Sequence, residues 1–126
     1  MALPLVASDD AHYYDGSDET RSFIMVRAES IGTEDLMKAV RQGDFYASQG
    51  PELLVRRDGR RIIVDCSPAD KVVFISNLAW KMGRVIREKG TVHAEYTMDE
   101  REKWVRVEIQ SGSDFAWSNI IQLPSA

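Results

Sequence analysis

From Leu53 to the end of the chain, apolar and polar side chains alternate in short runs. A period of two is typical of β-strands with one buried face, and no helical period is visible in this part of the sequence. Turn-forming residues separate the runs, so we expect short antiparallel strands joined by hairpins. The predicted strands are Leu53–Arg57, Arg60–Cys66, Val72–Ile75, Val85–Ile86, Thr91–Thr97, Lys103–Gln110 and Phe115–Leu123.

Six or seven such strands at this spacing predict an antiparallel β-sandwich of immunoglobulin-like type. In the strand Lys103–Gln110, the inward set is expected to be Val105, Val107 and Ile109. Trp117 is the best candidate for the aromatic residue of the core. His93 is predicted on the solvent face of its strand, and Cys66 is interpreted as a small buried side chain.

The first of these hairpins has the clearest turn. Asp58-Gly59 between two alternating strands predicts a two-residue type I′ turn, and this register pairs Val55 with Ile62. It also places two pairs of arginines opposite each other, and like charges in that position repel. The tip is therefore a candidate anion-binding site, for example for phosphate, or else a solvated tip with splayed side chains. The four residues are Arg56, Arg57, Arg60 and Arg61.

The N-terminal part of the chain mixes strand and helix periods. Leu3–Ser8 and Phe23–Ala28 are predicted strands, and the second is apolar on both faces at first. A helix is predicted over residues 33–42, with Thr33 as its N-cap and Gly43 just past its end. The fold class is therefore α+β, mainly β, with a boundary between residues 1–50 and 51–126.

An Asp-x-His pair follows the first predicted strand. In an extended backbone, residues two apart point to the same side, so Asp10 and His12 could bind one metal ion while Asp9 faces away. The alternative is a turn in which a carboxylate caps local N–H groups.

The stretch from Leu3 to Tyr14, the segment Ala39–Pro51 and the closing Ala116-Trp117-Ser118-Asn119 together resemble one family. They are similar to the C-terminal end of PHP-domain metal-dependent hydrolases, which act on phosphoesters. The resemblance covers nearly the whole chain. It implies that residues 1–50 are the end of a (β/α) barrel, with two strands and one helix, and that residues 51–126 are a β-rich C-terminal domain.

The resemblance also implies a partial active site. Asp10 and His12 match the last metal-ligand pair of the family, whereas its opening His-x-His has no counterpart here. The complete protein would bind zinc, manganese or iron and a phosphorylated small molecule, but this chain would hold no metal firmly and would be inactive alone. Asp9, Tyr46 and Ser48 are candidates to line the site; alternatively, Phe45 and Tyr46 anchor the C-terminal domain to the barrel end.

Composition limits the partners. The chain of 126 residues has a net charge of -4, which disfavours general binding to nucleic acid or to an anionic membrane surface. One cysteine allows no internal disulfide, and no apolar run is long enough for a membrane span. A cytoplasmic protein is expected.

Two functions remain open at this point. The chain is either the C-terminal piece of a metal-dependent phosphoesterase, or a stand-alone β-sandwich binding module in which the Asp-x-His is a turn. In both cases the strands of residues 3–28 have one helix to cover them. Residues 3–42 are therefore predicted to mediate a homodimer or a larger assembly.

The ligand count generates the first testable prediction. Because Asp10 and His12 supply two ligands where a catalytic site needs about three, the isolated chain should lose most bound metal on dialysis. Elemental analysis before and after a mild chelator measures this. Stoichiometric zinc or manganese that survives the chelator and is lost in Asp10→Ala would contradict it.

Overall fold

The computed structural model describes residues 22–27, 30–42, 45–79 and 82–122. The predicted strand Leu3–Ser8 and the candidate ligands Asp9, Asp10 and His12 lie outside these ranges. In chain order the elements are β1 (Phe23–Val26), α1 (Thr33–Gln42), β2 (Phe45–Ser48), β3 (Leu53–Asp58), β4 (Arg61–Ala69), β5 (Lys71–Ser76), β6 (Val85–Ile86), β7 (Thr91–Thr97), β8 (Trp104–Ser111), β9 (Asp114–Ser118) and β10 (Ile121–Gln122).

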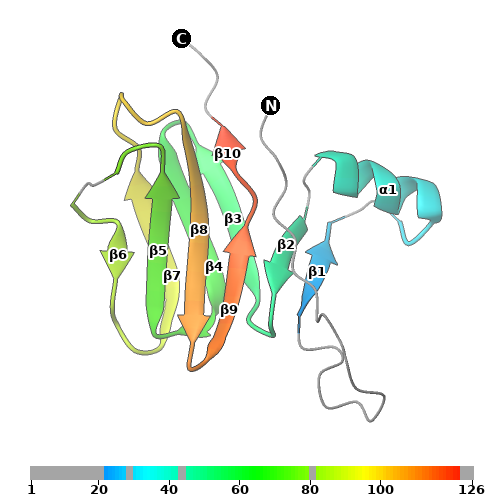
Figure 1. The fold of residues 1–126 in the computed structure, drawn as a ribbon, viewed down its shortest axis with the longest axis horizontal. Helices are drawn as coiled ribbons and strands as arrows, with labels where there is room; N and C mark the ends of the chain where they lie inside the picture. Colours follow the sequence, from blue (N-terminus) through cyan, green and yellow to red (C-terminus); the bar gives the residue numbers. More distant parts are fainter. Residues whose placement is uncertain (1–21, 28–29, 43–44, 80–81, 123–126) are drawn as a thin grey trace.

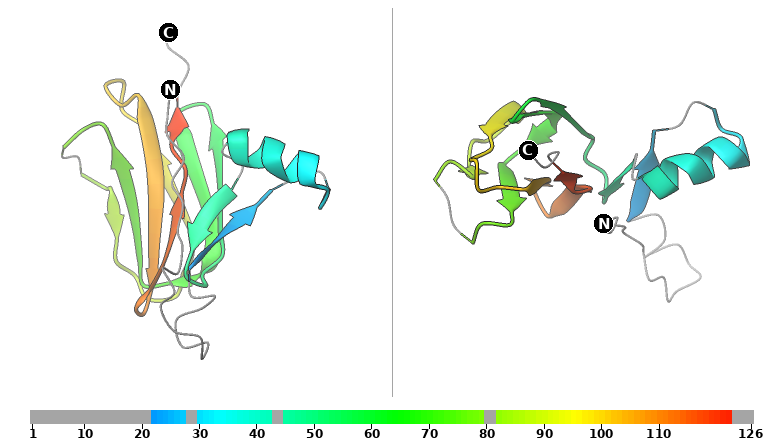
Figure 2. Two further views of the ribbon diagram at one scale, coloured as in Figure 1. Left: turned by 45° about the vertical axis from the view of Figure 1, so that its right-hand side comes forward. Right: turned by 90° about the horizontal axis from the view of Figure 1, so that it is seen from above.

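The strands form two antiparallel sheets that face each other (Figures 1 and 2). The large sheet has the order β1-β2-β9-β8-β5-β6, with β10 also paired to β8, and the small sheet has the order β3-β4-β7. Each strand predicted from Leu53 onward is present, with ends that differ by a few residues; the last is divided into β9 and β10. The prediction of a mainly β fold is confirmed.

One apolar layer between the sheets holds them together. Phe74 on β5 stacks on Tyr96 on β7, with ring centroids 4.8 Å apart, and so joins the large sheet to the small one. The inward set predicted for β8, Val105, Val107 and Ile109, is completely buried. The alternation of this strand is therefore a direct consequence of its covered face.

The prediction that Trp117 is the core aromatic is wrong. On β9 the buried positions are Ala116 and Ser118, so the residue between them points out of the sandwich. Trp117 is partly exposed, stacks on Phe115, and donates its indole N–H to Glu108 over 2.8 Å. Among the described residues, the fully buried aromatic of the large sheet is Phe74 instead.

The first hairpin forms, but its predicted register is wrong by two residues. Asp58 pairs with Arg61 and Val55 with Val64, so the turn residues are Gly59 and Arg60. Gly59 has a φ of 62°, which glycine adopts without steric cost. Arg60 leaves the β3–β4 ladder because its guanidinium donates to the carbonyls of Met98 and Asp99.

The N-terminal elements continue the large sheet. β2 pairs antiparallel with both β1 and β9, so strands from both sides of residue 50 belong to one sheet. The helix has the predicted bounds, but its first hydrogen bond runs from Leu36 N–H to Gly32 O, which makes Gly32 the N-cap in place of Thr33. Ser30 holds this start, since its Oγ accepts from Gly32 N–H.

The buried layer generates a stability prediction. Ile109→Ala should lower the free energy of unfolding by about 2–5 kcal/mol, because it removes fully buried methyl groups from the close-packed layer. Ile31→Ala is the matched control: Ile31 is 94% exposed, so its truncation should change stability by less than about 0.5 kcal/mol. Urea denaturation followed by circular dichroism measures both, and equal effects would contradict the assignment of this core.

Candidate functional site

A groove lies along β3, between the small sheet and the β1, β2 and β10 strands of the large sheet. Its volume is about 520 Å³, within the usual range of roughly 300–1,000 Å³ for ligand pockets. Apolar side chains from both sheets form most of its wall. The lining residues are Met25, Val26, Arg27, Gln42, Phe45, Tyr46, Leu53, Leu54, Val55, Ser118, Asn119, Ile120 and Ile121.

One wall of this groove is an open strand edge. Ser67 N–H donates to Glu52 O over 3.0 Å, which makes residue 52 a bonded position of the β3–β4 ladder. Bonded and non-bonded positions alternate along antiparallel strands. Leu54 and Arg56 therefore direct their backbone groups toward β4, whereas Leu53 and Val55 direct theirs away from it. Within the described ranges, β3 pairs with no strand on that second side.

Tyr46 on β2 reaches this edge. A hydrogen bond joins its hydroxyl to the backbone of Leu53. Burial raises the pKa of the Tyr46 phenol above its ordinary value, the Glu52 carboxylate raises it further, and the bond to Leu53 opposes the shift. The phenol therefore stays protonated at neutral pH and can act as a hydrogen-bond donor in the groove.

Ser48, the other predicted site-lining residue on β2, does not line this groove. It is fully buried; its Oγ donates to Pro51 O over 2.7 Å and accepts from Gly50 N–H over 2.9 Å. These bonds close the corner between β2 and β3. Whether Tyr46 or Ser48 approaches Asp9, Asp10 and His12 stays a prediction, because that segment lies outside the described ranges.

Ser118 and Asn119 line the groove, but neither of them was predicted from the sequence to have a role in a site. Ser118 Oγ accepts from Val107 N–H over 2.8 Å, and so replaces a backbone ladder bond where β9 ends. Asn119 donates to Phe45 O over 2.8 Å and ties the β9–β10 link to β2. A polar Ser-Asn pair between two apolar runs was the only local signal, and it is also typical of an ordinary turn.

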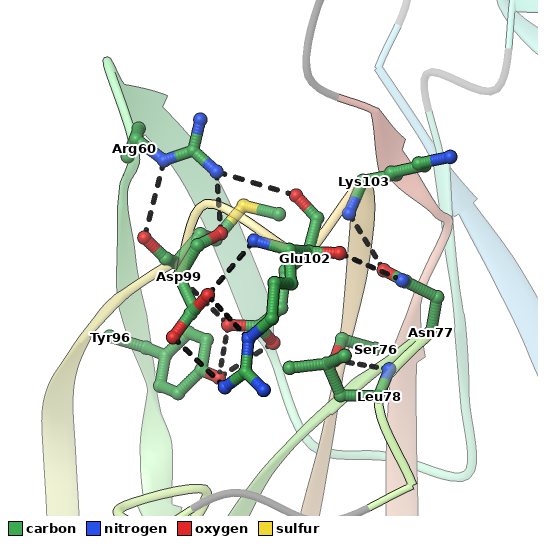
Figure 3. Close-up of polar contacts among 10 residues, drawn as sticks. Arg60, Ser76, Asn77, Leu78, Tyr96, Asp99, Glu102 and Lys103 are labelled. Atoms are coloured by element: carbon green, nitrogen blue, oxygen red, sulfur yellow. Dashed lines mark hydrogen bonds and ion pairs between the residues drawn. The ribbon is translucent and has the colours of Figure 1, made fainter.

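The four arginines of the hairpin tip have separate neighbours. Arg60 donates to carbonyls of the loop after β7 (Figure 3). Arg61 pairs with Glu95 over 3.1 Å, and Arg57 donates to Gly59 O over 3.5 Å. Arg56 lies opposite Ile63, so the two predicted Arg–Arg pairs are not directly opposed. Anion binding at this tip stays a prediction.

The loop that Arg60 contacts contains a buried carboxylate. Glu102 is 1% exposed and accepts from Tyr96 Oη, with distances of 2.8 and 2.7 Å to its two oxygens, and from Asp99 N–H over 2.8 Å. Asn77 secures the same loop by accepting from Lys103 N–H over 2.7 Å (Figure 3). Every named contact holds the link between β7 and β8, so we assign this cluster a structural role.

A second polar cluster lies on the solvent face of the small sheet. His93 Nδ1 is 2.8 Å from Asp65, and its Nε2 is 3.1 Å from Glu95. The hydrogen bond with Asp65 is the main cause that raises the pKa of His93, and the bond with Glu95 adds to it. The same contact with His93, aided by Arg61, lowers the pKa of Glu95. The prediction that His93 lies on the solvent face is confirmed.

The described residues include no group of three or more His, Cys, Asp or Glu that could hold a metal ion. In the His93 cluster, each carboxylate contacts a different ring nitrogen, so the donors do not converge on one point. Burial raises the pKa of the Cys66 thiol, and Asp65 raises it further, which disfavours the reactive thiolate.

Comparison with known proteins found no matching family model, no matching curated protein and no matching solved structure. Among the described residues, no helix has the length and apolar character needed to cross a membrane.

The His93 cluster generates a pH prediction. The midpoint of the His93 titration should lie above the ordinary value of about 6.5, and Asp65→Asn should lower it more than Glu95→Gln does. Because the folded pKa is the higher one, this stabilisation is fully present below the unfolded pKa and is lost as the pH rises through the folded pKa. NMR titration of the imidazole measures the midpoint, with Asp114→Asn as a remote control. A midpoint at or below about 6.5 in the parent chain would contradict this interpretation.

Proposed function

We propose that the chain is a β-sandwich binding module that takes an extended, apolar peptide segment of a protein partner into the groove along β3. The observation that carries this proposal is the open edge of β3 beside an apolar wall. An extended peptide can add to such an edge through main-chain hydrogen bonds while its side chains occupy the adjoining pocket. Val55 supplies outward backbone groups for this pairing, and Tyr46 already bonds the neighbouring Leu53.

We further propose an immunoglobulin-like layout for the sandwich. The orders β3-β4-β7 and β9-β8-β5-β6 correspond to strands A-B-E and G-F-C-C′ of that fold. Phe74 on β5 is the buried aromatic on the strand where antibody domains carry their core tryptophan. Since one fold hosts many functions, this layout does not indicate what the chain binds, and the proposed binding function is supported by the groove alone.

The metal-dependent phosphoesterase fragment is the second candidate. It is supported by the resemblance of Leu3–Tyr14 and Ala39–Pro51 to PHP-domain hydrolases, with Asp10 and His12 as the metal ligands. Strands of a (β/α) barrel run parallel, whereas β1 pairs antiparallel with β2, so support for a barrel remnant must come from residues before Ser22. Assembly through residues 3–42 is likewise a proposal, supported by Met25, which is 46% exposed on the edge strand β1.

Peptide selection tests the binding function. A library of random peptides displayed on phage should yield binders with alternating apolar residues, and their addition should protect the Val55 amide from hydrogen exchange. Val55→Trp should weaken binding at least about tenfold because the larger ring fills the groove. Val85→Trp is the matched control, since Val85 is an exposed valine on β6, away from the groove.

Thermal melting of both variants shows whether weaker binding comes from the filled groove or from a destabilised fold. A variant that melts at the parent temperature has kept its fold. Selected peptides that bind Val55→Trp as well as the parent chain, or that protect amides of other strands, would overturn the proposal. Failure to enrich any peptide would also count against it.

A further inference from the structure

Within the described residues, the outer edge of β7 is a second open edge, on the opposite side of the small sheet from β3. β7 is a terminal strand of the small sheet and pairs with β4 alone in the described part of the chain (Figure 1). With residues Thr91–Thr97 it is longer than the other terminal strands, β1, β3 and β6. A long uncovered edge is a template for pairing with another chain.

A hydrogen bond of Met98, the residue after β7, shows which residues of this strand direct their backbone groups toward β4. Met98 N–H donates to Arg60 O over 2.8 Å, in the same register as the β4–β7 ladder. Because bonded positions recur at every second residue of an antiparallel strand, Tyr96 and Ala94 also direct their backbone groups toward β4. His93 and Glu95 therefore direct their N–H and C=O groups outward, toward the open edge.

The same two residues have opposite charges on the solvent face when His93 is protonated, a form that its hydrogen bonds with Asp65 and Glu95 favour. His93 and Glu95 have side chains that are 47% and 44% exposed. When two β7 strands pair antiparallel, the residues whose N–H and C=O groups point outward must lie opposite each other, so that they can exchange hydrogen bonds. This condition allows a two-fold axis at residue 93, 94 or 95. An axis at 93 places histidine opposite histidine, and an axis at 95 places glutamate opposite glutamate. Only the axis at Ala94 places each histidine opposite a glutamate.

We propose that β7 is a homodimer interface, in which two copies pair their β7 strands antiparallel about a two-fold axis at Ala94. The two small sheets then form one continuous six-stranded sheet. His93 of each copy faces Glu95 of the other, in addition to Asp65 and Glu95 of its own chain, while Arg61 remains beside Glu95. Opposite charges in directly opposed positions stabilise such a pair, and they select this register over its neighbours.

The charge pattern favours a second copy of this chain over other strand edges as the occupant. The outer edge of β3 has Leu53, Val55 and Arg57 at its outward positions, so it lacks the alternating opposite charges that would match His93 and Glu95. A single strand pair buries less area than a standard stable interface, and the dimer should therefore be weak and dependent on concentration. The interface leaves the β3 groove open, so it does not depend on the proposed peptide binding.

Sedimentation velocity of the full chain, from about 1 μM to about 1 mM, tests the proposal. The parent chain should shift from monomer to dimer over this range. His93→Glu and Glu95→Lys should each weaken self-association at least about tenfold, because each places like charges opposite each other twice. Met25→Lys, on the edge strand β1, tests the alternative assembly through residues 3–42; a dimer that forms through β7 should be unchanged by it.

An equimolar mixture of the two charge variants distinguishes a lost interface from a lost fold. In the mixed dimer, glutamate at position 93 faces lysine at position 95, and the native Glu95 faces the native His93, so association should return. A parent chain that is monomeric at every concentration would overturn the proposal. So would a dimer that Met25→Lys abolishes, or variants that stay monomeric when mixed although circular dichroism shows them folded.

Discussion

The contact on which the rest of the structure depends is the stack of Phe74 on Tyr96. It crosses the space between the two sheets and fixes their distance at the centre of one shared apolar layer. Tyr96 also directs its hydroxyl to the buried Glu102, so one side chain serves both the core and the β7–β8 link. Burial of Glu102 is tolerated because its oxygens have donors.

Local hydrogen bonds secure several of the links between the two sheets. The β2–β3 corner is closed by Ser48, the β7–β8 link by Glu102, and Asp70 between β4 and β5 accepts from Gly112 N–H over 2.8 Å. In the described residues, no strand covers the outer edges of β3 and β7. Both proposed interactions use these edges: the apolar groove beside β3 suits a peptide, and the alternating charges of β7 suit a second copy.

Predictions from local sequence patterns were correct where the burial of one face of a strand or helix determines the structure. The inward set on β8 and the bounds of the helix were correct, since each depends on side chains a few residues apart. Trp117 was wrongly predicted to be buried because it is more hydrophobic than its small neighbours. In β9, however, the alternating positions that face the core are Ala116 and Ser118. The hairpin register failed because Arg60 is held by carbonyls almost forty residues away, a contact that no local pattern contains.

The sequence by itself determined that the chain is mainly β, where most strands lie, and which residues of β8 face the core. It also predicted that His93 faces solvent, because the period of two is a property of the extended backbone. Only the tertiary structure decided that Tyr46 reaches Leu53, that Ser118 and Asn119 line the groove, and that Asp65 and Glu95 flank His93. These contacts join strands that are distant in the sequence. They depend on which strands pair and in which register, and the local alternation of apolar and polar residues does not specify either.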